Sequence, residues 1–205
     1  MPYRPTERTR ARLAAARERI VDAALDQLAE GGYASASIAS VARRAGVATG
    51  TVYRHFPSKA DLFAEVFRRA SQREVDVLRA MTDRGEPVGQ RLAAWVEAFV
   101  RRALAEPVRA YALIAEPVDP AVEAERLTFR RAYADLFERA LHDGVVRREL
   151  APLDAQLAAA AIVGALAEAL VGPLQRRDVG ADALVAGLQL FVLRSVGIAY
   201  EHADA

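Results

Sequence analysis

The stretch that decides the fold is residues 37–67, SIASVARRAGVATGTVYRHFPSKADLFAEVF. Ser37 is a good N-cap for a helix over residues 38–45, in which apolar residues recur at the helical spacing of i, i+3, i+4 and i+7. Gly46 can adopt the left-handed conformation that ends such a helix. The next segment, residues 49–55, is too short and too polar to be a stable helix alone. It therefore has to lie on the surface of other helices and present its side chains outward.

A third helix is expected after Pro57, where Ser58 can cap it and Asp61 follows three residues later. Two short helices joined by a glycine turn are typical of a helix-turn-helix, whose second helix enters the major groove of DNA. The alternative is a helical hairpin whose polar residues only face water. That alternative explains neither the brevity of the second helix nor the position of Lys59 at a helix N-terminus, where a cation opposes the helix dipole. The candidate DNA-binding residues are Ser37, Arg43, Thr49, Gly50, Thr51, Tyr53, Arg54, His55 and Lys59.

Residues 15–67 resemble the DNA-binding segment of the TetR family of bacterial transcriptional regulators. The resemblance rests on Val41-Ala42, Ala45-Gly46-Val47, Gly50-Thr51-Val52-Tyr53, His55-Phe56, Lys59 and Leu62. Carried onto these positions, it implies that Thr51 contacts bases and that Tyr53, His55 and Lys59 hold phosphates. Ala48 departs from the family pattern, which usually has a Ser or Thr cap there. The missing side-chain cap would destabilise the second helix by about 1 kcal/mol.

The composition sets limits on the class of protein. A chain of 205 residues is long enough for one large or two small domains, and it contains no cysteine for disulfides or cysteine-based metal sites. The polar, Arg-rich N-terminus lacks the apolar segment of a secretory signal, so we expect a cytoplasmic protein. Although the net charge is only +1, residues 1–60 carry ten Arg or Lys against five Asp or Glu, and the rest carries 18 against 22. This asymmetry suits one domain that binds phosphates and another that does not.

We expect three parts along the chain. Residues 1–12 contain two prolines and no apolar period, which indicates a flexible basic arm that either lies along DNA or is a solvated tail. Residues 13–67 form the helix-turn-helix DNA-binding domain, with a first helix over residues 13–30 packed behind the two short ones. Residues 68–205 form a larger helical domain, which the resemblance assigns to ligand binding and dimerisation. The helix that begins at Ser58 crosses this boundary, so we expect it to transmit changes between the two domains.

The last two predicted helices, residues 154–171 and 181–200, are rich in apolar residues. The first of them is apolar nearly all round, as in helices that are buried on every side or lie in a membrane. Its uncharged run, residues 155–167, is too short to span a bilayer, and Glu168 interrupts its extension. We therefore expect no membrane span. Instead, both helices should pack against a second copy of the chain, with small residues such as Gly164 letting the helices approach closely.

The resemblance implies a small-molecule pocket inside the second domain. Large aromatic and apolar residues recur there on several predicted helices, and a cavity lined by them would suit a flat or mostly apolar ligand. Tyr111, Tyr133 and Glu168 could supply polar contacts. For each aromatic residue, the alternative is an ordinary place in the core. The candidate ligand-binding residues are Leu78, Met81, Trp95, Phe99, Tyr111, Phe129, Tyr133, Phe137 and Glu168.

Other chemistry finds little support in the sequence. The histidines, His55, His142 and His202, are far apart, so we expect no metal site and no cofactor. No glycine-rich phosphate loop and no nucleophile motif is present. Glu116 and Asp119 cluster with a third carboxylate across a proline-rich turn, and we expect a solvated turn rather than a catalytic group.

The sequence thus predicts an all-α protein with an N-terminal three-helix helix-turn-helix domain and a larger C-terminal helical domain. Its expected function is sequence-specific binding of double-stranded operator DNA, with repression until a small, mostly apolar ligand binds. A homodimer is expected because one recognition helix of seven residues contacts few bases, whereas a two-fold dimer reads two half-sites. The alternatives are an activator, a regulator that needs no ligand, or, outside this class, a helical enzyme or lipid-carrying protein.

Overall fold

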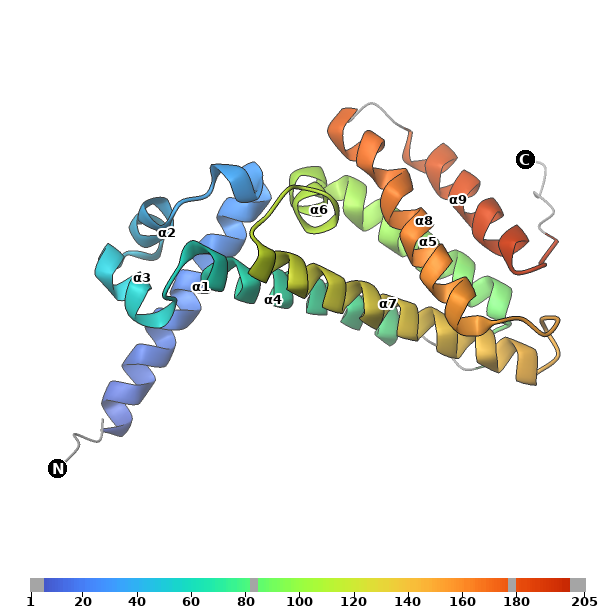
Figure 1. Ribbon diagram of the computed structural model, residues 1–205, viewed down its shortest axis with the longest axis horizontal. Coiled ribbons are helices and arrows are strands. Elements are labelled where there is room, and N and C mark those ends of the chain that lie inside the picture. The colour runs from blue at the N-terminus through green and yellow to red at the C-terminus, as the bar shows by residue number, and fades with distance from the viewer. Residues whose placement is uncertain (1–5, 82–84, 177–179, 200–205) are drawn as a thin grey trace.

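The computed structural model describes residues 6–81, 85–176 and 180–199. Within these ranges every regular element is a helix, which confirms the all-α prediction (Figure 1). In chain order the helices are α1 (Glu7–Ser35), α2 (Ile38–Ala45), α3 (Thr49–His55), α4 (Lys59–Ala80), α5 (Val88–Ala105), α6 (Pro107–Ile114), α7 (Pro120–Val146), α8 (Ala155–Arg176) and α9 (Ala181–Ser195).

A first hydrophobic core lies where α1 to α4 pack together at the N-terminal end of the molecule (Figure 1). Leu28 of α1, Val52 of α3 and Phe63 of α4 are fully buried in it. Val41 of α2 is also fully buried, and it lies on the apolar face that the sequence predicts for this helix. The two short helices therefore depend on α1 and α4 for their place in the fold.

A second, larger core fills the C-terminal part, between α5, α7, α8 and α9. Leu92 and Val96 of α5, Leu141 of α7 and Leu170 of α8 are fully buried there. Apolar side chains on these helices recur three to four residues apart and so form stripes that face one another. This packing gives the C-terminal part its own interior.

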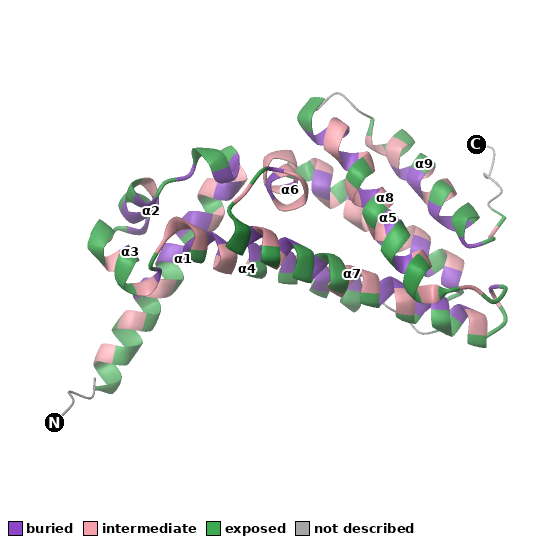
Figure 2. Cartoon of the chain, in the orientation of Figure 1, coloured by how far each residue is buried: buried purple, intermediate pink, exposed green. Residues whose placement is uncertain are grey.

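Two connections join the cores. α4 contributes Phe67 to the first core and Val75 to the second, so the change from one core to the other falls within this helix. In addition, Ala112 of α6 and Val122 of α7 are fully buried in the first core. Figure 2 shows buried positions on α6 beside the end of α1. The helix-turn-helix part is thus attached to the rest both by α4 and by the turn between α6 and α7.

α1 is longer than the sequence predicts. It begins at Glu7, where the Thr6 side chain accepts a hydrogen bond from the backbone N–H of Thr9, so residues 7–12 are helical where we expected a flexible arm. The expectation overlooked that Arg, Ala, Leu and Glu are strong helix formers even without an apolar stripe. Residues 1–5 of the predicted arm lie outside the described residues. At its other end, α1 continues past a break at Gly32 to Ser35.

α8 is the one helix among the described residues that is long and apolar enough, by length and composition, to cross a membrane. In the fold it packs against α6 and α7, and Ile162, Leu166 and Leu170 on that side are buried. It runs to Arg176, beyond the predicted end at residue 171. The structure thus uses one face of α8 for the second core.

The outer surface of α8 and α9 carries uncovered apolar side chains beside the exposed Glu168. Leu157 of α8 is 67% exposed, and Phe191 of α9 is 50% exposed. Gly164 and Gly187 lie on the same outward side of their helices, where an added methyl group would meet no atom within 4 Å. We call Leu157, Gly164, Gly187 and Phe191 the α8–α9 face. Its two glycines have no side chain that would keep another helix at a distance.

The break in α1 generates a prediction for Gly32. Its φ of 74° and ψ of −176° are accessible essentially only to glycine, and a Cβ atom there would lie 2.8 Å from a carboxylate oxygen of Glu116. We expect Gly32→Ala to lower the free energy of unfolding by about 1–3 kcal/mol, measured by urea denaturation. The control is Gly50→Ala in α3, where the methyl group meets nothing within 4 Å and stability should hold or rise. Equal stability of the Gly32 variant and the wild type would contradict this interpretation.

Candidate functional site

Local hydrogen bonds fix both ends of α2, and its C-terminal end leads directly into the turn to α3. The Ser37 hydroxyl accepts from the Ser40 N–H at 3.1 Å, and the Ser40 hydroxyl accepts from the Ser37 N–H at 3.2 Å, which completes a capping box. Gly46 ends α2 in the left-handed conformation, with φ 65° and ψ 38°. Ala48 precedes α3 without a side-chain cap, as the sequence predicts. The glycine turn therefore sets the direction in which α3 starts, and α3 has no side-chain cap at its N-terminus.

α3 presents a polar face to solvent. Val52 is its one buried residue and anchors the helix in the first core, whereas the Tyr53 side chain is 51% exposed. Most of its remaining side chains face solvent, as in a helix that enters a DNA groove. Of the other predicted DNA-binding residues on α3, Thr49, Gly50 and Arg54 are exposed, and Thr51 and His55 are half-buried.

The predicted DNA-binding residues outside α3 have different surroundings. Arg43 is exposed on α2, the helix that packs against α3. Ser37 uses its hydroxyl in the capping box, so its first role here is to start α2.

Lys59 points away from solvent rather than outward. Its ammonium group donates to the Tyr33 carbonyl at 2.8 Å and lies 4.1 Å from the centre of the Tyr33 ring. Burial lowers the pKa of Lys59 below its usual value, and the carboxylates of Asp119 and Glu116 act in the opposite direction. In the free protein, this lysine ties α4 to the end of α1. Its role as a phosphate contact stays a prediction.

Two carboxylates from the turn after α6 form hydrogen bonds with the end of α1. Glu116 is buried, and its two oxygens accept hydrogen bonds from the backbone N–H groups of Tyr33 at 2.7 Å and Ala34 at 2.9 Å. The Tyr33 hydroxyl donates to Asp119. Burial and this hydrogen bond raise the pKa of Tyr33 above its usual value. We call the contacts of Glu116 and Asp119 with Tyr33 and Ala34 the α1 latch.

The expectation of a solvated turn is therefore wrong for Glu116, which is buried, whereas Asp119 is exposed although it bonds to Tyr33. Glu116 is only 9% exposed because the break at Gly32 frees two backbone N–H groups of α1 that need acceptors, and its carboxylate supplies both. No short-range pattern links these positions, which are separated by more than 80 residues. The latch makes the turn between α6 and α7 a physical link between the two cores.

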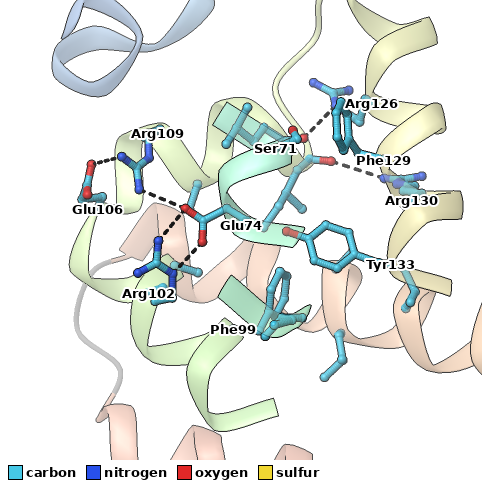
Figure 3. Close-up of a pocket in the computed structure, with 18 of the residues that line it drawn as sticks. Ser71, Glu74, Phe99, Arg102, Glu106, Arg109, Arg126, Phe129, Arg130 and Tyr133 are labelled. Atoms are coloured by element: carbon cyan, nitrogen blue, oxygen red, sulfur yellow. Dashed lines mark hydrogen bonds and ion pairs between the residues drawn. The ribbon is translucent and has the colours of Figure 1, made fainter. Parts of the chain in front are cut away.

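The second core contains a cavity between α4, α5, α6, α7 and α8 that is partly open to solvent (Figure 3). Apolar side chains form most of its wall. Phe99 and Tyr133 meet edge-to-face there, with ring centroids 6.0 Å apart. Of the predicted ligand-binding residues, Leu78, Phe99, Phe129, Tyr133 and Phe137 line this cavity.

Four predicted ligand-binding residues do not line the cavity. Trp95 lies behind it and packs edge-on against Phe137, with centroids 5.3 Å apart, so it is a core residue as the alternative held. The Tyr111 hydroxyl accepts a hydrogen bond from Gln175 instead. Met81 lies past the end of α4 and is 39% exposed, and Glu168 is exposed on the outer side of α8. Helical spacing alone does not separate these outward positions from the inward ones.

The cavity wall also carries polar residues that the sequence analysis missed. Glu74 of α4 lies between Arg102 and Arg109, as Figure 3 shows, and accepts from Arg102 at 2.6 and 2.9 Å and from Arg109 at 3.4 Å. Arg126 and Arg130 of α7 also line the cavity, as do Ser71 and Glu106. The sequence did contain a signal that the two α7 arginines face the cavity. They share one helix face with the predicted aromatic residues, because the spacing of positions 126, 129, 130, 133 and 137 follows the i, i+3, i+4 rule. Burial raises the pKa of the Tyr133 hydroxyl above its usual value.

Comparison with known proteins places this geometry in a family. Residues 20–66 match the family model described as bacterial regulatory proteins, tetR family, and residues 85–170 match the one described as tetracyclin repressor-like, C-terminal domain. Over 134 residues the chain is 35% identical to the HTH-type transcriptional repressor KstR of Mycolicibacterium smegmatis. This alignment covers 62% of this chain and 64% of that protein. The corresponding repressor of Mycobacterium tuberculosis is 34% identical and is covered to 59%. The chain thus spans less than two thirds of the length of these relatives.

Solved structures share the fold over most of the chain. The fatty acid degradation regulator FadR from Bacillus halodurans superposes with a TM-score of 0.75 at 26% identity, covering 86% of this chain and 94% of that one. FadR from Bacillus subtilis in complex with stearoyl-CoA has a TM-score of 0.75 at 20% identity, covering 89% and 99%. At that identity the second similarity concerns the fold alone.

His55 of α3 generates a prediction about pH. Its Nε2 atom is buried without a hydrogen-bond partner among the described residues, and burial, Arg17 and Arg54 lower its pKa. The unfolded chain therefore binds a proton more readily, and stability should fall as the pH drops through the ordinary histidine value of about 6.5, by at most about 1.4 kcal/mol per pH unit. We expect His55→Gln to remove this slope in denaturation between pH 7.5 and about 5.5, while His142→Gln at an exposed site keeps it. An unchanged slope in His55→Gln would refute the assignment.

Proposed function

Because the chain belongs to the TetR family of bacterial regulatory proteins, we propose that it is a sequence-specific DNA-binding transcriptional regulator, a homodimer that represses transcription until a small ligand binds. The observation that carries this proposal is the exposed polar face of α3, a helix that Val52 anchors in the first core. A helix presented in this way fits the major groove of operator DNA. In this proposal the protein acts in the cytoplasm by binding alone, with no catalytic step.

The α8–α9 face supports the homodimer. Leu157 and Phe191 leave apolar surface in water, and apolar surface is stabilised by burial at roughly 25 cal/mol per Å². Gly164 and Gly187 let the backbones of two helices approach closely. Two copies joined here would present two copies of α3 related by a two-fold axis, as an operator with two half-sites requires.

The cavity supports a ligand-responsive repressor over a regulator that needs no ligand. It is lined mostly by apolar and aromatic side chains with a few polar groups, as small-molecule sites usually are. Ser71 and Glu74 of α4 lie on its wall, and the same helix carries Phe67 in the first core. A ligand in the cavity therefore touches an element shared with the DNA-binding part. The proposed ligand is small and mostly apolar.

The proposal is tested by selecting bound sequences from random double-stranded DNA with the purified full chain. The expected result is an inverted repeat whose half-sites are centred one helical turn or a multiple apart, about 34–36 Å per turn. Selection of no common sequence would refute sequence-specific DNA binding. A selected site without two-fold symmetry would refute the homodimer on DNA. Transcription from the selected site in a cell-free reaction, with and without the protein, separates repressor from activator.

Substitutions on α3 should separate residues that bind phosphates from residues that contact bases. We expect Tyr53→Phe to weaken binding to all sequences by about 2- to 10-fold, because it removes one hydrogen bond to a phosphate. Arg54→Gln should lower the log–log salt slope by about 0.9 for each lost phosphate contact. Thr51→Ala should instead change which bases are selected. The measurements are operator titration at several salt concentrations and repeated selection for each variant. Identical base preference in Thr51→Ala would remove Thr51 from base readout.

The homodimer predicts a change of mass. Light scattering on the wild type should give about twice the 22.2 kDa of one chain, and Gly164→Asp or Gly187→Asp should give one chain and weaken operator binding. Ala124→Asp, on an exposed position of α7, is the matched control and should stay dimeric. Dimers in both glycine variants would place the interface elsewhere.

A further inference from the structure

Two arginines of α7 line the cavity at its end nearest the first core. Arg126 is only 8% exposed, and its guanidinium lies 5.8 Å from the centre of the Phe67 ring. Arg130, one turn further along α7, donates to the carbonyl of Ile114 at 3.3 Å (Figure 3). Arg126 donates to three backbone carbonyls, those of Ala112 at 3.0 Å, Leu113 at 3.0 Å and Glu116 at 2.6 Å.

These carbonyls belong to the end of α6 and the turn after it. The last carbonyls of a helix have no partner within the helix and carry its negative dipole end, so they attract cations. Arg126 and Arg130 therefore hold the α6 end in place. The same turn carries Glu116, whose carboxylate closes the α1 latch on Tyr33. A continuous series of hydrogen bonds thus runs from the cavity wall to the DNA-binding part.

The charges around the cavity are unequal at its two ends. Glu74 lies between Arg102 and Arg109, so the cations of α5 and α6 face carboxylates. On α7, Arg126 pairs with Glu123, which lies outside the cavity wall. Arg130 is bonded to a backbone carbonyl rather than a carboxylate. At the α7 end, Arg130 is therefore the cation that no ion pair among the described residues balances, and it lies next to the aromatic wall.

We infer that Arg126 and Arg130 bind an anionic group of the ligand, such as a carboxylate at the end of an apolar body, and that this binding opens the α1 latch. The inference rests on the proposed function and assigns its ligand class and its coupling residues. A carboxylate is a stronger acceptor for a guanidinium than a backbone carbonyl is, so it competes for the same N–H donors. The α6 end is released as the ligand binds, and Glu116 loses the support that holds it on α1.

The first test needs neither DNA nor a ligand. Hydrogen exchange of the peptide that contains Tyr33 and Ala34 is measured by mass spectrometry in the full chain. Arg126→Lys keeps the charge but cannot reach all three carbonyls, so exchange should become about tenfold faster, the change given by losing about 1.4 kcal/mol of protection. Arg130→Gln should give a smaller increase in the same peptide. Arg131→Gln, on the exposed face of the same helix, should give none.

The second test uses matched probes, saturated fatty acids of 8 to 16 carbons and the alcohols of the same lengths. We expect at least one acid, and none of the alcohols, to accelerate exchange in the wild-type Tyr33 peptide. Combining Arg126→Gln with Arg130→Gln should abolish that response. The variant Glu116→Gln serves as the reference for the exchange rate of the Tyr33 peptide when the latch is open. Thermal melting checks that every variant is folded.

The outcomes separate this inference from the proposed function. Wild-type exchange in Arg126→Lys, an equal response to acids and alcohols, or no response to either series overturns the inference while leaving operator selection unaffected. Failure of operator selection with an acid-specific exchange response overturns the proposed function and leaves the anion site and latch standing. An acid response that survives in the double variant places the anion on other residues and also overturns the inference.

Discussion

The arrangement of the whole molecule depends on one buried carboxylate. Glu116 accepts from two backbone N–H groups that the break at Gly32 leaves without partners in α1, and such groups are costly to bury unpaired. Without this acceptor, the backbone N–H groups of Tyr33 and Ala34 would lose their hydrogen bonds where the last turn of α1 packs against α6. With it, the helix-turn-helix part is tied to the larger core at a second point besides α4. The position of α1, against which α3 packs, is therefore held by the turn after α6 as well as by the first core.

The helix-turn-helix could be predicted closely because its signals are local. Ser37 and Gly46 mark the ends of α2 through interactions within three or four residues, and Val52 marks the buried side of α3. The absence of a cap at Ala48 is likewise a property of one position. Such signals do not depend on which distant segment packs nearby, so the short helices lie within a residue of where the sequence places them.

The remainder depends on pairings across long stretches of chain. Lys59 has the right spacing for a phosphate contact, yet in the free protein its nearest acceptor is a carbonyl of α1. Trp95 has the right spacing for the cavity, yet Phe137 stands between it and the space. Helical periodicity shows which face of a helix points inward. It does not show whether an inward side chain lines a cavity or is buried behind another side chain. The arginines of the cavity were missed for the same reason, since a charged residue on an amphipathic helix is by default assigned to water.

The uncovered α8–α9 face has a consequence for how the protein responds to its own abundance. An isolated copy leaves Leu157 and Phe191 in water, so in the proposed dimer association and folding stability are linked through mass action. The melting temperature then rises with protein concentration. Occupancy of a two-fold site depends on the square of the free chain concentration when dimers are scarce. A modest change in synthesis rate is thereby converted into a steeper change in bound DNA, before any ligand is involved.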